Sequence, residues 1–450
     1  MRFHLKRTVL WVVILLTGLI FIDFKVYDNS YLVNDQPLRK MFNQTTVGQT
    51  TQSNFTKIVS YLQTFTKRAV IKSQKLWATE AVKENLELLW PSREFYENDR
   101  ITNQLNYRLG NESKSNNKLS DKGVKLKKIY LDSGFGGKRL GRWVFLEDKC
   151  NINTCEITRD RKYTDTADAL FFQSSSSGTI TRKSTQQIWM IFMLESPYHT
   201  AGLRSLRNVF NWTATYRHDS DIVAPYEKFV RYDEKVKFLP QKKSYAAGKT
   251  KKVAWFVSNC GARNERLQYA RKLSKYIQVD IYGACGPLRC PRKNDKCFEM
   301  LNTDYKFYLS FENSNCRDYI TEKFFVTGLQ HDVIPIVMGA APEDYSRAAP
   351  PHSFIHVDEF QSPEELAQYL HKLDQNDDLY NEYFRWKGTG SFINTYFWCR
   401  VCAMLHETSR ESHAYRDLEK WWRGEGICIG KDNWRQRQRT SKYIAEDYLA

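Results

Sequence analysis

A short aromatic run, Tyr305–Phe311, followed at once by dense polar residues, places the strongest constraint on this fold. The run has the length and composition of a buried β-strand. A helical pattern opens at Thr321-Glu-Lys323, with a hydroxyl and a carboxylate suited to a helix start. Open α/β sheets bind anionic ligands where polar residues lie between a buried strand and a helix N-terminus. Residues 311–323 therefore predict an anion-binding site.

Alternating strand and helix patterns surround this stretch and predict a doubly wound α/β domain. In order, they are a strand at 253–257, a helix at 265–276, a strand at 279–282, the strand and site above, and a strand at 333–338. Ser362, followed by Pro and two Glu, has the residues of a helix N-cap and first turn. We expect this domain to span 246–405, with a C-terminal extension over 406–450.

The first half of the chain carries strand patterns at 129–131, 167–172 and 187–194. They predict another, less regular α/β domain over 125–245, which an unpatterned lysine-rich segment at 228–252 links to the domain that follows. The third strand ends at Glu195-Ser-Pro197. A carboxylate at the end of a buried strand is suited to be a general base, and a turn or helix-capping glutamate is the alternative.

Two cationic residues are candidates for binding a nucleoside diphosphate. Arg263 and Lys323 both follow strands, and the loops at the carboxyl ends of parallel strands converge on one crevice. Arginine can hold a diphosphate with two hydrogen bonds, and lysine acts as a point charge. The aromatic residues Tyr305, Tyr319 and Phe311 are candidates to flank a base or sugar, with a core position the alternative for Phe311.

Two motifs are candidates for metal binding. Asp219-Ser-Asp221 has the spacing by which some transferases hold a metal ion on a diphosphate, although this spacing is common by chance. Cys399-x-x-Cys402, with other cysteines upstream, matches zinc ligands or a redox pair. A structural loop and disulfides are the respective alternatives.

The N-terminus predicts the compartment. Arg2, Lys6 and Arg7 precede an uncharged apolar run at 8–22, and no small-x-small cleavage site follows it. We expect a cytoplasmic tail at 1–7, a single-pass signal anchor at 8–24, and a luminal stem and helical collar at 25–124. A luminal body removes nucleic acid from the expected partners despite the net charge of +17.

Luminal chemistry bears on two further residue types. Sequons for N-glycosylation occur at Asn43, Asn54, Asn111 and Asn211, and we expect Asn211 to be partly buried and unmodified between Phe210 and Trp212. The oxidising lumen favours disulfides among the ten cysteines. Local pairs are expected, Cys150 with Cys155 and Cys399 with Cys402. Cys316, inside the polar stretch, is expected to be paired or to shape its loop.

The central motifs resemble those of the α1,3/4-fucosyltransferases. They are Phe311-Glu-Asn-Ser, Asp318-Tyr-Ile-Thr-Glu-Lys323 and the strand that leads to Gly339, and Glu195-Ser-Pro197 and 211–221 agree with them in the first half. The resemblance covers 125–405. It implies a GT-B arrangement, in which two Rossmann-like α/β domains face a cleft. The tail, anchor and stem also match the layout of Golgi members.

This resemblance implies an inverting transfer from GDP-β-L-fucose and assigns the site residues. Glu195 is the implied base, and Glu322 binds the fucose or stabilises its cationic transition state. The implied donor-binding residues are Arg263, Lys323, Asn313, Tyr319 and Tyr305, with Glu312 in support. The family needs no metal ion for chemistry, which makes Asp219-Ser-Asp221 a structural loop or an acceptor-side cluster and leaves manganese stimulation open.

Three peripheral segments resemble the core-type branch of the family, namely 392–402, 421–428 and 147–155. That branch fucosylates O3 of the Asn-linked GlcNAc of N-glycans. The alternatives are a Lewis-type enzyme acting on terminal LacNAc or LacdiNAc, and a non-catalytic Golgi glycan-binding protein. The expected partners are therefore GDP-fucose, the N-glycans of glycoproteins and the Golgi membrane.

Overall fold

All described residues belong to one compact unit, Lys83–Ala450. The computed structural model describes residues 86–92, 98–109, 125–132, 140–173, 180, 182, 184–291, 295–408 and 413–436. The expected tail, anchor, most of the stem, and the sequons at Asn43, Asn54 and Asn111 lie outside these residues. Within the described part, no helix is both long and apolar enough to cross a membrane.

The second half contains the expected parallel sheet, in the order β12-β11-β10-β8-β9. Its strands are β8 (Lys251–Phe256), β9 (Val279–Tyr282), β10 (Tyr305–Phe311), β11 (Ile334–Met338) and β12 (Ile355–His356). The central strand β10 is buried along its whole length. The winding direction reverses between β8 and β10, and open α/β sheets bind ligands outside the carboxyl ends of such strands.

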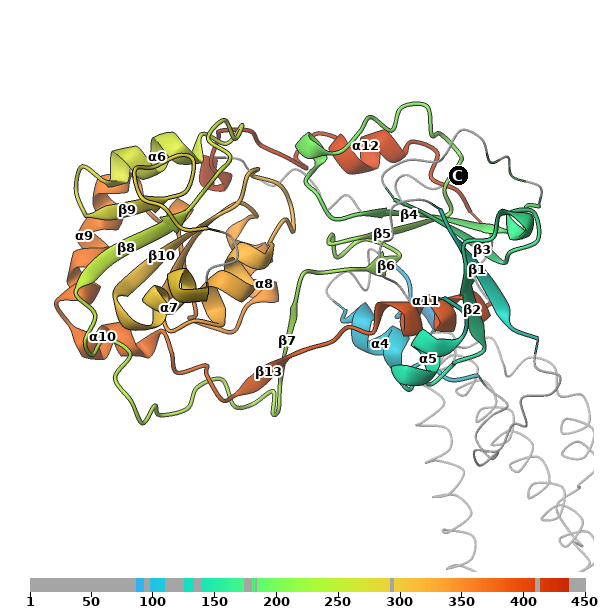
Figure 1. Ribbon diagram of the computed structural model, residues 1–450, viewed down its shortest axis with the longest axis horizontal. Helices are drawn as coiled ribbons and strands as arrows, with labels where there is room; N and C mark the ends of the chain where they lie inside the picture. Colours follow the sequence, from blue (N-terminus) through green and yellow to red (C-terminus); the bar gives the residue numbers. More distant parts are fainter. Residues whose placement is uncertain are drawn as a thin grey trace, which may run out of the picture. The chain divides into compact units, whose positions relative to one another are not determined.

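Helices cover both faces of this second sheet (Figure 1). One face packs against α6 (Arg266–Leu273), α9 (Pro363–Asp374) and α10 (Asp377–Glu382). The other packs against α7 (Asp295–Thr303), η3 (Lys323–Leu329) and α8 (Pro342–Ala348). Ser362 caps α9 as expected, since its hydroxyl accepts from Glu365 N at 3.2 Å.

The first half contains a six-stranded parallel sheet in the order β2-β1-β3-β4-β5-β6. Its strands are β1 (Lys127–Leu131), β2 (Cys155–Thr158), β3 (Ala169–Gln173), β4 (Ile188–Met193), β5 (Trp212–Thr215) and β6 (Ile222–Val223). Successive residues of a strand pack into hydrophobic cores on opposite faces of the sheet. Ile129 and Leu131 pack into one core, and Tyr130 packs into the other. The expected α/β character of this half is confirmed.

The C-terminal segment, defined as 397–436 with 409–412 outside the described part, returns to this first sheet. On one face α11 (Phe397–His406) packs with the strands and lies beside α4 (Arg100–Asn106) and α5 (Trp143–Glu147) (Figure 1). On the other face α12 (Leu418–Arg423) completes the core. Residues 397–405, which we assigned by sequence to the second domain, therefore pack in the core of the first.

A small antiparallel ladder joins the two passes of the chain between the sheets. Strand β7 (Lys228–Arg231) pairs with β13 (Gly390–Ile393) over four residue pairs. A Cβ on Gly390 would lie 2.2 Å from Val230 O, so the close approach requires glycine here. The segment 228–252 had no local strand pattern because the partner of β7 lies far along the chain.

All ten cysteines are paired, but the two expected local pairs are wrong. Cys150 pairs with Cys399, and Cys155 pairs with Cys402. Both bonds connect the region of α5 and β2 to α11, because α11 packs on the first sheet. The remaining pairs are Cys260–Cys285, Cys290–Cys297 and Cys316–Cys428.

The Asn211 sequon is buried, as expected. Its side chain is 2% exposed, and its Oδ1 accepts from Trp189 N at 2.9 Å and from Arg182 at 2.7 Å. Its Nδ2 donates to His413 O. These bonds leave no room for an attached glycan in the folded protein.

Asp219 and Asp221 are structural residues of the first sheet. Asp219 forms an ion pair with Arg217, and both side chains are fully buried. Burial raises the pKa of Asp219, but the Arg217 guanidinium outweighs it and the pKa is lowered overall. Asp221 Oδ2 accepts from Thr213 N and from the Tyr415 hydroxyl at 2.8 and 2.9 Å.

We predict that Asp219→Asn destabilises the protein by about 3–5 kcal/mol, because it leaves the Arg217 charge buried without its partner. Urea unfolding followed by tryptophan fluorescence measures this loss. Asp160→Asn is the control. Asp160 pairs with Lys162 at the surface, so this substitution should leave the free energy of unfolding unchanged. Equal stability of the two variants would contradict the structural role of Asp219.

Candidate active site

The 312–322 loop, which follows β10, is built around a buried carboxylate. Glu312 is fully buried, and its Oε1 accepts from Thr321 N at 2.8 Å and from the Thr321 hydroxyl at 2.9 Å. Burial raises the pKa of Glu312, opposed by the nearby Lys323 ammonium. A side chain at Gly339 would collide with Glu312, since a Cβ there would lie 2.6 Å from Glu312 Cγ. Gly339 therefore makes room for the carboxylate.

Lys323 lies between two carboxylates of unequal exposure. Its Nζ is 3.2 Å from Glu312 Oε2 and 3.1 Å from Glu322 Oε1. Burial lowers the pKa of Lys323, but the two carboxylates outweigh this effect and the pKa is raised overall. The Glu322 side chain is 55% exposed, whereas that of Glu312 is 0% exposed. Of its two carboxylate partners, Lys323 thus has one that is fixed and one that solvent or a ligand can displace.

The helix after this loop begins later than expected. We expected it to start at Thr321, but η3 is a π-helix that begins at Lys323. The Thr321 hydroxyl donates to Glu312. The Thr321 hydroxyl still accepts from Lys323 N at 3.5 Å, so it combines a long local capping contact with a tertiary hydrogen bond.

Arg263 is held at the rim of the crevice by its neighbours. It is exposed, and its guanidinium lies 4.9 Å from the centre of the Tyr198 ring. The next residue, Asn264, donates to Glu312 O at 2.9 Å, and Arg266 donates to Phe311 O at 2.7 Å. The loops after β8 and β10, which bracket the change in winding direction, are thereby bonded to each other.

Glu195 reaches the 312–322 loop from the first sheet. It follows β4 and is exposed, and the Tyr319 hydroxyl donates to its Oε2 at 3.2 Å. Tyr319 is 1% exposed, and burial raises the pKa of its hydroxyl, which keeps it protonated and able to donate. Beside this contact, the Ser196 and Ser314 hydroxyls lie 2.8 Å apart.

The structure brings most of the predicted site residues to the 312–322 loop and the segments bonded to it, but not Phe311 or Tyr305. Asn313 lies in the same loop and accepts from the Ser314 hydroxyl, whereas Phe311 packs in the core against Trp255. Tyr305 lies at the other end of β10, about 20 Å from Phe311 at ~3.3 Å per residue. Its hydroxyl bonds to Asp280. Its predicted place in the donor pocket is wrong, because it lies at the amino-terminal end of β10 and the 312–322 loop follows the carboxyl end.

The C-terminal segment also holds the 312–322 loop, which we did not predict. The Cys316–Cys428 disulfide joins them, and Arg317 N donates to Ile427 O at 2.9 Å. Farther along, Trp434 Nε1 donates to Gly339 O at 2.9 Å. In the sequence, the signal of this contact was that neither Cys316 nor Cys428 had been given a partner.

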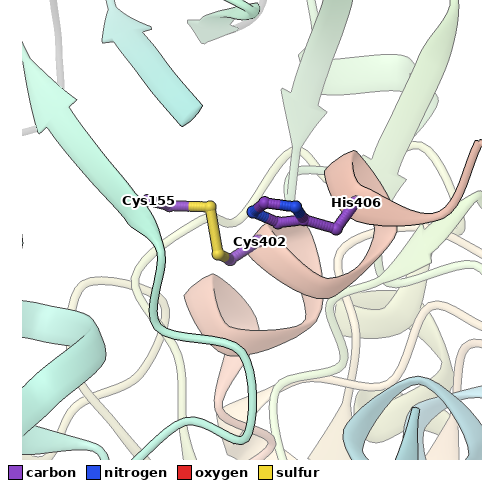
Figure 2. A group of neighbouring side chains, drawn as sticks. All are labelled: Cys155, Cys402 and His406. Atoms are coloured by element: carbon purple, nitrogen blue, oxygen red, sulfur yellow. A yellow bond between two sulfur atoms is a disulfide. The ribbon is translucent and has the colours of Figure 1, made fainter. Parts of the chain in front are cut away.

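One group among the described residues has side chains of metal-binding type at close range: Cys155, Cys402 and His406 (Figure 2). The two sulfurs are joined in a disulfide and so are not thiolate ligands. His406 Nε2 lies 3.0 Å from the Thr154 hydroxyl. The group is therefore a structural staple between β2 and α11.

We predict that Thr321→Val destabilises the protein by about 1.5–3 kcal/mol, because a buried carboxylate loses a hydroxyl donor. Chemical unfolding with an unchanged m-value measures the effect. The matched control is Thr166→Val, which removes an exposed hydroxyl. An effect no larger than that of the control would show that Glu312 does not need the bond.

Two family profiles match this chain in order. "Fucosyltransferase, N-terminal" matches residues 125–227, and "Glycosyltransferase family 10 (fucosyltransferase) C-term" matches residues 246–421. A solved structure of an α1,3-fucosyltransferase with GDP-fucose is 15% identical, with a TM-score of 0.45, covering 66% of this chain and 95% of that one.

Relatives extend the match well beyond the site. Glycoprotein 3-alpha-L-fucosyltransferase A of Drosophila melanogaster is 53% identical, covering 82% of this chain and 73% of its own. A 4-galactosyl-N-acetylglucosaminide 3-alpha-L-fucosyltransferase of Homo sapiens is 37% identical, covering 60% and 75%. Since the profiles match both halves and the Drosophila relative spans most of the chain, the family resemblance is confirmed: this protein belongs to glycosyltransferase family 10, the fucosyltransferases.

Proposed function

We propose that this protein transfers L-fucose from GDP-β-L-fucose, with inversion, in α1,3 linkage to the Asn-linked GlcNAc of N-glycans. The observation that carries the proposal is the bond from Tyr319 to Glu195. It brings an exposed carboxylate of the first sheet to the loop that carries Glu322 and Lys323. One-step inversion needs such a base on one face of the sugar and charge stabilisation of the leaving group on the other.

On the donor side, Arg263 and Lys323 bind the diphosphate. Arg263 offers a planar pair of donors at the rim, and Lys323 supplies a point charge. As the diphosphate enters, it replaces the exposed Glu322 as a partner of Lys323, while the buried Glu312 remains. Glu322 is then released toward the fucose, where its negative charge stabilises the oxocarbenium-like transition state. Asn313 lines the same pocket.

On the acceptor side, Glu195 removes the proton from the O3 hydroxyl. The new O3–C1 bond forms as the bond from C1 to the phosphate oxygen breaks, and GDP carries the electron pair away. Tyr319 orients the Glu195 carboxylate through its hydrogen bond. Arg263 and Lys323 neutralise the charge on GDP, so we expect transfer without an added metal ion, with manganese stimulation a separate question.

The relatives support a glycoprotein acceptor. The Drosophila relative named as a glycoprotein fucosyltransferase is 53% identical, and the human relative named for 4-galactosyl-N-acetylglucosaminide is 37% identical. A Lewis-type enzyme is therefore the second candidate. The proposed enzyme has a GT-B arrangement and is held in the Golgi membrane by an anchor at 8–24, with its body in the lumen.

We predict that Glu195→Gln lowers kcat about 10²–10⁴-fold, because the amide cannot accept the proton. GDP binding, measured by calorimetry, should change little, since Glu195 lies on the acceptor side. Glu382→Gln is the matched control, as Glu382 is exposed and pairs with Arg385. Unchanged turnover of the Glu195 variant would remove it as the base.

We predict that, given GDP-fucose, the enzyme modifies core N-glycans far faster than LacNAc or LacdiNAc. Mass spectrometry of the products, with digestion that separates the Asn-linked GlcNAc from the antennae, locates the fucose. Faster transfer to either antennal disaccharide would favour the Lewis-type candidate. Binding of glycans without any transfer would favour a non-catalytic lectin.

A further inference from the structure

A large basic cavity lies beside the Glu195-Ser-Pro turn, and nothing in the proposed chemistry uses most of it. Its volume is about 1030 Å³, at the upper end of the ~300–1,000 Å³ range of ligand pockets. Its wall combines residues after β4, residues of α12 and one residue of the loop after β8. The charged and aromatic members that matter are Tyr198, Arg204, Arg207, Arg263, Lys420 and Arg423.

The cavity carries excess positive charge. Five cationic side chains face two carboxylates, those of Asp417 and Glu419. Arg207 pairs with Asp417 at 3.1 Å, and Arg423 pairs with Glu419 at 2.7 Å. Each of these cations is neutralised by its own carboxylate, and both ion pairs help to hold α12 in place.

Two cations, Arg204 and Lys420, remain for an acceptor ligand. Arg423 is fixed further because it donates to carbonyls of Pro197, Thr200 and Ala201. Arg204, in contrast, has a side chain that is 90% exposed and only a 4.0 Å approach to Glu419. Lys420 is exposed, and it forms no ion pair with the part of the chain that the structure describes. The fifth cation, Arg263, is the residue proposed above to bind the donor diphosphate.

The position of the cavity identifies what enters it. Pro197, in its wall, lies two residues after Glu195, so the cavity adjoins the atoms attached to the acceptor sugar. The sugars of an N-glycan core are uncharged and offer no partner to the two excess cations, Arg204 and Lys420. The polypeptide attached to the first GlcNAc does carry charges, and complementary charge speeds and orients association.

We propose that this cavity receives the polypeptide that flanks the glycosylated asparagine, and that Arg204 and Lys420 select acidic side chains there. This inference rests on the proposed function, because it requires a glycoprotein acceptor. Exposed ion pairs are weak and screened by salt, so each should change kcat/KM only about two- to fivefold. The effect is a preference among acceptor sites, separate from the chemical step.

The test uses three glycopeptides with one neutral glycan and flanks carrying two Asp, two Asn or two Lys. The wild type should favour the acidic over the neutral peptide about three- to tenfold in kcat/KM, less so at high salt. The double variant Arg204→Gln/Lys420→Gln should use all three equally. Lys272→Gln/Lys275→Gln, on exposed positions at the end of α6, is the matched control and should keep the preference. A released glycan without peptide should react at the same rate with all forms, which shows that the variants are folded and active.

Four results would overturn the inference. One is equal use of the three peptides by the wild type, and another is a preference that survives in the double variant. A third is a preference that follows a sialylated antenna rather than the flank, which would assign the cavity to the glycan arm. No transfer to any glycopeptide, with transfer to a free antennal disaccharide, would overturn the proposed acceptor and the inference with it.

Discussion

The buried carboxylate of Glu312 organises the centre of this protein. An ionised carboxylate without partners is very costly to bury, so its surroundings must supply donors. The Thr321 backbone and hydroxyl bind one oxygen, and Lys323 lies against the other. Gly339 leaves the space that the side chain fills. The position of Lys323, and with it the charge available to a diphosphate, follows from the need to neutralise Glu312.

The C-terminal segment links this centre to the first sheet. It completes both cores of that sheet through α11 and α12, then continues to the 312–322 loop. The Cys316–Cys428 bond and the Arg317 hydrogen bond to Ile427 fasten it there. Loss of this segment would uncover two hydrophobic cores and the donor-side loop together. The core of the first domain can therefore be completed only after the second domain has been synthesised, because α11 and α12 follow that domain in the chain.

Sequence patterns predicted what depends on neighbouring residues and missed what depends on distant ones. The strand Tyr305–Phe311 and the Ser362 cap were correct because composition and local hydrogen bonding determine them. The β7–β13 ladder and the Cys150–Cys399 bond were not predictable, because each joins segments more than 150 residues apart. For the site, the motif wrongly grouped Tyr305 with Lys323, because Tyr305 begins β10 and the 312–322 loop follows the end of that strand. The place of Glu195 at the end of a buried strand made it a candidate base, but only the family resemblance favoured that role over a turn or capping glutamate.

Tyr319 gives the two sides of the site a physical connection. Its ring is buried among aromatic residues, including Tyr216 at 5.0 Å, so its position is set by the packing of the 312–322 loop. Its hydroxyl nevertheless ends on Glu195, which belongs to the other sheet. Any shift of the loop when Lys323 exchanges Glu322 for a diphosphate would move the donor of this hydrogen bond. In the mechanism proposed above, this one side chain would couple donor binding to the orientation of the base.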